Sequence, residues 1–120
     1  MSEFEVDRAS EEVAGRTVSV LRLKGQLDAH TFSGLQRELE ALSTEPDAPR
    51  VVLDCSQLEY VSSAGLGVLK KTTREFRDRQ GDLRLAALTP KIASVMSLLG
   101  FDKVIRVFGD RAGAVESFGE

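Results

Sequence analysis

The stretch Val51-Val-Leu-Asp-Cys-Ser-Gln-Leu-Glu-Tyr-Val-Ser-Ser-Ala-Gly-Leu-Gly-Val-Leu69 decides how this chain folds. Its first three residues are apolar and predict a short buried strand that is bounded by Asp54. A loop, two serines and a glycine-rich entry into a helix follow. A serine at that entry, Ser63, lies beside unpaired backbone N–H groups and the positive end of the helix dipole. It can act as a helix cap, or it can carry a phosphate that alters a binding surface.

The segments on either side of this stretch alternate between strand and helix patterns. Strands are predicted at residues 4–9, 17–24, 82–88 and 104–108, and helices from residue 31 to 42, 63 to 80, 89 to 99 and 110 to 118. The order is β-β-α-β-α-β-α-β-α, which requires crossover connections and a mostly parallel sheet. We therefore expect a single α/β domain over residues 1–120, with helices packed on a small mixed sheet whose first two strands are antiparallel.

Composition excludes several classes of function. The 120 residues have a formal net charge of -3 and no basic cluster of the kind that nucleic-acid binding requires. No apolar run approaches the roughly 20 residues of a membrane span, and the acidic N-terminus lacks the pattern of a secretory signal. The single Cys55 cannot form an internal disulfide, which fits a reducing cytoplasm. With one cysteine and one histidine, we expect neither a metal site nor another cofactor.

An enzyme is the less favoured alternative. The loops after the second and third predicted strands could bring together Ser63, His30 and either Asp28 or Asp54 as a nucleophilic triad. However, the chain has no Gly-x-Ser-x-Gly elbow around that serine. Gly65-Leu66-Gly67 lacks the third glycine of a dinucleotide-binding loop, and no phosphate-binding Gly-Lys-Ser/Thr is present. We therefore expect no catalytic residues, but a protein-binding surface that carries a modifiable serine.

Each candidate residue also has a purely structural interpretation. Ser63 can be an ordinary N-cap, and Asp28 can close an Asx turn before the first helix. Gly65 and Gly67 can serve close packing of the helix on the sheet. The cations that follow on the same helix can form a solvated face, and Met96 and the leucines of the third helix are expected in the core.

Two segments of the chain resemble the signature segments of the STAS domain, whose best-known members are bacterial anti-sigma factor antagonists. They are Gln26-Leu-Asp-Ala-His-Thr31 and Leu58-Glu-Tyr-Val-Ser-Ser-Ala-Gly-Leu-Gly-Val-Leu69. Leu99-Gly-Phe-Asp-Lys-Val104 is similar to the exit of the family's third helix. The resemblance therefore extends over the whole chain and implies the STAS fold.

The resemblance also implies a function and a set of site residues. Ser63 matches the phosphoacceptor of a partner kinase that is also the anti-sigma factor, and Asp28 matches the loop aspartate near that acceptor. The implied partner is an ATP-binding serine kinase in the bacterial cytoplasm, and phosphorylation switches the antagonist off. Whether the protein is a monomer or a weak dimer stays open. The implied partner-binding residues are Asp28, Ser62, Ser63, Ala64, Gly65, Leu66 and Gly67.

Two residues depart from the family pattern. The aspartate that often precedes the acceptor is Ser62 in this chain, and the serine or threonine that often follows it is Ala64. The first change removes a negative charge and a hydrogen-bond acceptor near the transferred phosphate. These departures motivate the alternative of a non-phosphorylated STAS scaffold subunit, bound to a lipid-transport ATPase or within a stress-signalling complex.

Overall fold

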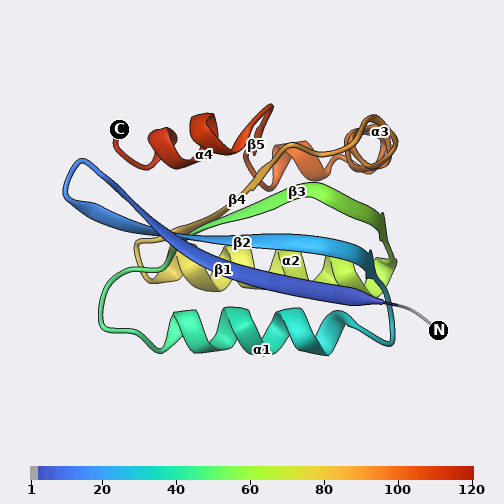
Figure 1. Cartoon of the computed structure of the whole chain (residues 1–120), viewed down its shortest axis with the longest axis horizontal. Helices are drawn as coiled ribbons and strands as arrows, with labels where there is room; N and C mark the ends of the chain where they lie inside the picture. The colour runs from blue at the N-terminus through green and yellow to red at the C-terminus, as the bar shows by residue number, and fades with distance from the viewer. Residues whose placement is uncertain (1–2) are drawn as a thin grey trace.

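The computed structural model describes residues 3–120; Met1 and Ser2, which open the acidic N-terminal stretch, lie outside this range. Within it the chain forms one five-stranded sheet with the order β1-β2-β3-β4-β5 (Figure 1). β1 (Phe4–Val13) pairs antiparallel with β2 (Arg16–Leu27). β3 (Arg50–Val61), β4 (Asp82–Ala86) and β5 (Val107–Phe108) continue the sheet in parallel. The predicted element order and the mixed sheet are confirmed.

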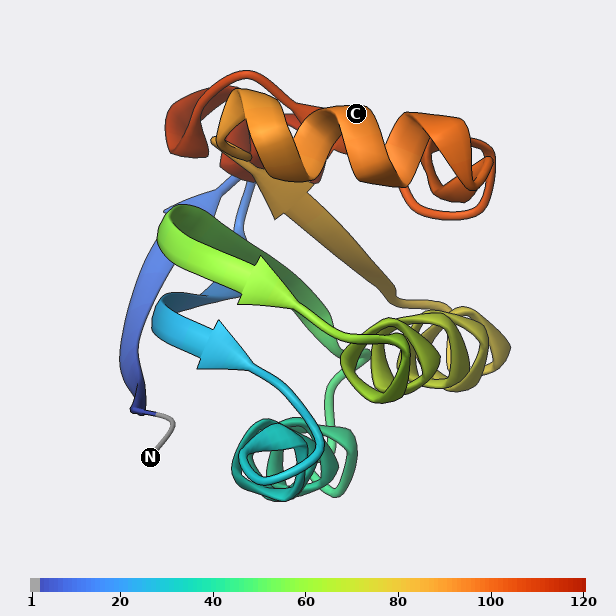
Figure 2. The ribbon, with the colours of Figure 1, turned by 90° about the vertical axis from the view of Figure 1, so that its right-hand side faces the viewer.

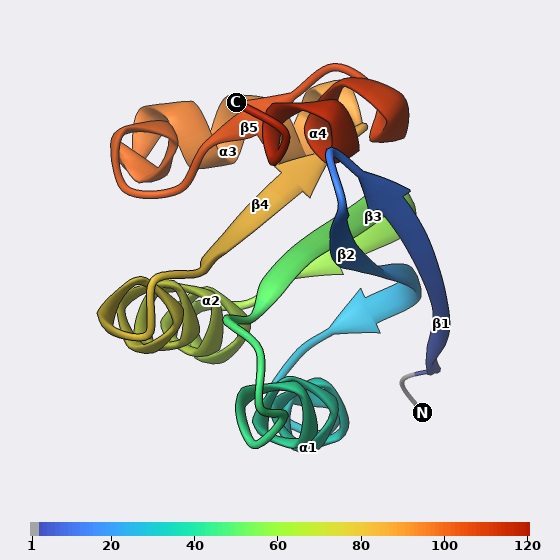
Figure 3. The same cartoon turned by 90° about the vertical axis from the view of Figure 1, so that its left-hand side faces the viewer.

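Helices cover both faces of this sheet (Figures 2 and 3). α1 (Phe32–Ser43) and α2 (Ser63–Asp78) lie on one face, and α4 (Arg111–Ser117) lies on the other; α3 (Pro90–Leu98) follows β4, and its buried residues join the same core as α1 and α2. A 3₁₀ turn over Phe101–Lys103 comes before the last predicted strand, and of the predicted residues 104–108 only Val107 and Phe108 form a strand. Because β2, β3 and β4 are parallel, their carboxyl ends meet at one end of the sheet, where open α/β folds place their sites.

Two hydrophobic cores hold the layers together. The larger core lies between the sheet and the helices α1, α2 and α3, and it includes Leu53, Leu69 and Phe76, each at most 1% exposed. The smaller core lies beneath α4 and joins Val20 of β2 to Phe118. The predicted apolar face of α2 is confirmed, since Leu66, Leu69, Thr73 and Phe76 are all buried.

β3 is longer than the sequence predicted. The short strand was expected to end at Asp54, yet the strand continues to Val61. The reason is that the alternation of inward and outward side chains breaks twice. Cys55, Leu58 and Val61 all pack on the larger core, although each is three residues from the next. A period of three does not match the period of two that identifies a strand.

Two irregularities in the pairing of β2 with β3 account for this spacing. The register shifts between Arg22 and Lys24, and again between Gly25 and Gln26. At each shift β3 contains one more residue than β2, which is the definition of a β-bulge. A bulged strand bends, and β3 visibly curves as it approaches the start of α2 (Figure 1).

Candidate functional site

The candidate site lies where β2 and β3 end and lead into α1 and α2. The backbone N–H of Ser62 donates to the carbonyl oxygen of Leu27 over 2.8 Å. This bond joins the last residue of β2 to the residue that precedes α2. The structure therefore brings together the two loops that the sequence had singled out, with Asp28 directly after the bonded carbonyl.

Ser62, and not Ser63, caps α2. Ser62 has an extended backbone, and its hydroxyl oxygen accepts a hydrogen bond of 3.3 Å from the N–H of Gly65. The interpretation of Ser63 as the N-cap is therefore wrong, because Ser63 is the first helical residue. The bond from Ser62 to Leu27 keeps position 62 in the geometry of the strand, and the helix begins at Ser63, one residue earlier than a cap at Ser63 would imply.

Replacing the cap should weaken the fold. We expect Ser62→Ala to lower the free energy of unfolding by about 1 kcal/mol, because it removes the acceptor for the Gly65 N–H. Ser63→Ala is the matched control, and its effect should stay within about 0.5 kcal/mol. Urea denaturation followed by circular dichroism measures both values. Equal losses in the two variants would contradict the assignment of the cap.

Ser63 presents an unused hydroxyl at the start of α2. Its side chain is exposed, and among residues 3–120 its hydroxyl forms no hydrogen bond. The backbone N–H groups of Ser63 and Ala64 also have no acceptor within that range. The first turn of α2 carries no acidic side chain that would offset the helix dipole. Such a helix start favours an anionic group attached to Ser63.

Asp28 organises the neighbouring loop. One of its carboxylate oxygens accepts hydrogen bonds from the backbone N–H groups of His30, at 2.8 Å, and Thr31, at 3.2 Å. The Thr31 hydroxyl in turn donates to the carbonyl oxygen of Gln26 over 2.7 Å. The expected Asx turn is confirmed. Asp28 thereby fixes the shape of the loop that lies beside Ser62.

The residues of the possible triad do not assemble. His30 is exposed, and within the described range no hydrogen bond joins its imidazole to the Ser63 hydroxyl. Asp54 is buried within β3, where it accepts a hydrogen bond of 3.0 Å from the N–H of Ser56. Its other carboxylate oxygen lies 3.8 Å from the guanidinium of Arg111 in α4. Within residues 3–120 no side chain is therefore hydrogen-bonded to the Ser63 hydroxyl as a base of a triad would be.

The two glycines of α2 have different surroundings. A Cβ atom at Gly65 would lie 2.8 Å from Cγ of Leu27, which is fully buried. The close packing expected at Gly65 is therefore confirmed. A Cβ atom at Gly67 would have no neighbour within 4 Å, so the same expectation is wrong for Gly67.

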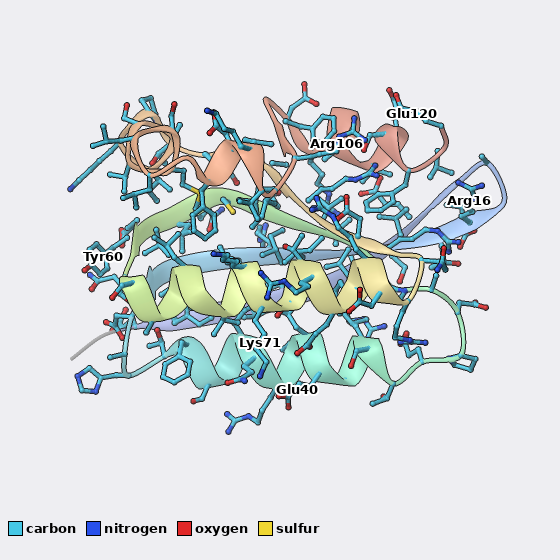
Figure 4. The ribbon with its side chains drawn as sticks, turned by 180° about the vertical axis from the view of Figure 1, so that it is seen from behind. Arg16, Glu40, Tyr60, Lys71, Arg106 and Glu120 are labelled. Carbon is cyan, nitrogen blue, oxygen red and sulfur yellow. The ribbon has the colours of Figure 1, made fainter. Side chains whose placement is uncertain are left out.

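Large apolar side chains are exposed around this end of the molecule. Tyr60, two residues before the cap, is 48% exposed and lies beside the start of α2 (Figure 4). Leu98 and Leu99, at the end of α3, are 87% and 59% exposed. Figure 2 shows α3 across the same end of the sheet at which β3 leads into α2. Exposed apolar groups of this kind are typical of protein-binding surfaces.

The exposure of α3 corrects the expectation that its leucines belong to the core. Only Ile92 and Met96 of this helix are buried. A nine-residue helix that packs on one side buries a single stripe of side chains, and two residues four positions apart are enough to fill that stripe. The sequence already indicated this exposure. It contains three further apolar residues in this segment, and a single buried stripe cannot include them all: Val95, Leu98 and Leu99.

Cys55 is buried and lies apart from this exposed surface. Its thiol is 1% exposed and donates a weak hydrogen bond of 3.5 Å to the carbonyl oxygen of Leu53. Burial, followed by the nearby charge of Asp54, raises the pKa of the Cys55 thiol to about 12. The reactive thiolate is therefore almost absent from the folded protein near neutral pH.

We expect the folded protein to resist thiol labelling. At pH 8 the native chain should react with Ellman's reagent at least about 100-fold more slowly than the chain in 6 M guanidinium, because the buried thiol is neutral. The raised pKa also means that Cys55 favours the folded state below about pH 9, and that this contribution falls as the pH rises toward 12. Equal labelling rates for the native and unfolded chains would contradict the burial of Cys55.

Among residues 3–120 no three side chains of His, Cys, Asp or Glu are grouped so that they could hold a metal ion. No helix in that range has the length and apolar composition to cross a membrane.

The family model of the STAS domain matches residues 10–114. A protein of Bordetella bronchiseptica, BtrV, which is named as a candidate anti-sigma factor antagonist, is 34% identical over 96 residues, covering 80% of this chain and 82% of the relative.

Two solved structures are also similar to the chain. An anti-sigma factor antagonist from Mycobacterium paratuberculosis superposes with a TM-score of 0.79 at 25% identity, covering 97% of this chain and 96% of the other. The phosphorylated form of the Bacillus cell fate determinant SpoIIAA has the same fold, with a TM-score of 0.68 at 20% identity. The alignment covers 93% of this chain and 99% of that protein.

Proposed function

Because this chain belongs to the STAS domain family, we propose that it is an anti-sigma factor antagonist. It binds an ATP-binding anti-sigma factor kinase, so that a sigma factor is released, and phosphorylation of Ser63 ends the binding. One observation carries the proposal: an exposed serine without hydrogen-bond partners in the described structure stands at the start of α2, beside unpaired N–H groups. The names of the relatives support the class of function.

The position of the cap explains how Ser63 can be modified without damage to the fold. Ser62 alone satisfies the N–H of Gly65, so a phosphate on Ser63 removes no internal hydrogen bond. In the transfer, the Ser63 oxygen forms a bond to the γ-phosphorus of ATP as the bond to ADP breaks, and the hydroxyl proton passes to a base of the kinase. The phosphate adds about -1.5 to -2 charges at pH 7, which the helix start can accommodate.

The departures from the family pattern are compatible with this proposal. Aspartate and serine are both strong N-cap residues, so Ser62 can perform the capping role of the usual aspartate. Ala64 is the second helical residue, and a methyl group there takes part in none of the capping bonds.

The proposed docking surface comprises Asp28, Ser62, Ser63, Ala64 and Gly67, together with the exposed side chains of Tyr60 and Leu98. Gly65 and Leu66, which the sequence also assigned to partner binding, are buried and support this surface from beneath. The Asx turn of Asp28 fixes one side of it, and the apolar side chains supply area that a partner can bury. A partner packed against a neutral Ser63 hydroxyl would meet a desolvated dianion after phosphorylation, which is strongly unfavourable.

Capture of partners from a lysate of the source cells tests this function. Immobilised wild-type protein should retain a small ATP-binding anti-sigma factor, identified by mass spectrometry, and Ser63→Glu protein should not. Incubation of the purified partner with wild-type protein and ATP should yield a phosphopeptide that contains Ser63. Retention of a transporter ATPase or a large scaffold by both forms would instead support the non-phosphorylated STAS role and overturn the proposal.

A further inference from the structure

We infer that the exposed face of α2 beyond Ser63 is part of the docking surface, and that it selects an anti-sigma factor whose facing surface is acidic. This inference rests on the proposed function and specifies the chemistry of the partner. Ser63, Gly67, Lys70, Arg74 and Arg77 follow one another at steps of three or four residues, which places them along one face of the helix. All five are exposed. Figure 4 looks onto α2 from outside, with Lys71 on the side that faces α1.

The charge of this face differs from that of the rest of the molecule. Between residues 63 and 78, α2 carries four exposed cations and two exposed carboxylates, a net charge of +2. The whole chain has a net charge of -3, so the remaining residues together carry -5. The exposed face of α2 is therefore a positively charged stripe on the surface of an acidic protein. This positive stripe begins at the proposed phosphoacceptor. The six charged residues are Lys70, Lys71, Arg74, Glu75, Arg77 and Asp78.

The central cations of the stripe are not used inside the protein. Arg77 pairs with Asp82 at 2.8 Å, and Lys71 has only a 3.9 Å contact with Glu75. Lys70 and Arg74 form no ion pair with any residue from 3 to 120. A shallow hollow of about 400 Å³ lies over Gly67, Lys70 and Arg74, and it is also lined by Lys71 and by the carboxylates of Glu75 and Asp78. A carboxylate of a docked partner could enter it and pair with both cations.

Gly67 indicates that this face meets a protein and not only water. Glycine within a helix lowers its stability relative to alanine. Packing within residues 3–120 does not require glycine at this position, because a Cβ atom would have no neighbour there within 4 Å. Because Gly67 has no side chain, the backbone of α2 is uncovered at this point, one turn after Ser63 and one turn before Lys70. A partner can therefore approach the helix backbone at this point.

The stripe also gives phosphorylation a second effect on binding. A phosphate on Ser63 adds about -1.5 to -2 charges to a face whose net charge is +2, and so brings it close to neutrality. The modification therefore weakens the electrostatic attraction of an acidic partner, in addition to its local clash with the partner's surface.

Charge reversal on this face tests the inference. The double variant Lys70→Glu/Arg74→Glu should bind the captured anti-sigma factor about 100-fold more weakly than wild type in 50 mM NaCl, by biolayer interferometry. Lys24→Glu/Arg37→Glu, on β2 and α1, is the matched control with the same change in charge, and its affinity should fall less than about threefold. Wild-type affinity should also fall as salt is added.

The outcomes separate the inference from the proposed function. If wild-type protein does not bind an anti-sigma factor, the proposed function fails. If it binds, and both double variants lose the same affinity, the inference is wrong while the proposed function stands. Gly67→Ala gives an independent measurement: its Tm should rise by about 4 °C while its affinity falls about tenfold. A lowered Tm or an unchanged affinity would overturn the assigned role of Gly67.

Discussion

Ser63→Glu should weaken binding to the anti-sigma factor several hundredfold. The substitution places a carboxylate at the centre of the proposed docking surface, where the wild-type hydroxyl is neutral and exposed. A desolvated charge that opposes a partner costs about 3–4 kcal/mol, which corresponds to a loss of about 200- to 900-fold in affinity. Isothermal titration calorimetry with the purified partner measures this loss. Wild-type protein that the kinase has phosphorylated should lose at least as much affinity.

Ser63→Ala provides the matched control for this prediction. It removes the hydroxyl but adds no charge, and the hydroxyl forms no hydrogen bond within residues 3–120. The variant should therefore bind within about threefold of wild type and accept no phosphate from the kinase. If Ser63→Glu binds as tightly as wild type, then Ser63 is not the switch, whatever the partner is.

Gly65→Ala should destabilise the protein by about 2 kcal/mol. The added methyl group would lie 2.8 Å from Cγ and 3.1 Å from the carbonyl oxygen of Leu27. Leu27 is fully buried, so it cannot move without disturbing the larger core. Overpacking of this kind costs about 1–3 kcal/mol, which exceeds the helix preference of alanine. Urea denaturation gives the free energy directly.

Gly67→Ala is the natural comparison, because it makes the same change two residues away. The free energy of unfolding should change in opposite directions in the two variants, since position 67 is open to solvent. A stable Gly65→Ala protein would mean that α2 can shift away from the end of β2. The bond between Ser62 and Leu27 would then not define the position of the helix.

Much of the fold could be predicted because its signals are local. The helical spacing of Leu66, Leu69 and Phe76 identified the buried face of α2, and the structure buries all three. Thr89, followed by Pro90, predicted the start of α3, and the hydroxyl of Thr89 does cap that helix. The alternation of strands and helices then determined a parallel arrangement, because crossover connections leave few other topologies.

The site was predicted less completely, because its geometry depends on contacts between distant segments. The cap at Ser62 follows from its bond to Leu27, 35 positions earlier in the sequence. The exposure of Leu98 depends on how a short helix lies on the sheet, which its apolar composition does not reveal. The proximity of Asp28 to the second signature segment was expected from the strand ends and from the resemblance, and the pairing of β2 with β3 supplies its physical basis.

The two bulges of β3 have a consequence for how the gene can change. In a regular strand, losing one codon moves every later side chain to the opposite face. Here Cys55 and Leu58 share a face at a spacing of three, so a deletion of Ser56 or Gln57 would remove the first bulge and return them to the spacing of two of a regular strand, with Leu58 still facing the core. The same deletion would alter the approach of the chain to Ser63. We therefore expect such a deletion to leave the core contacts of β3 in place but to reduce the bend with which the strand approaches α2.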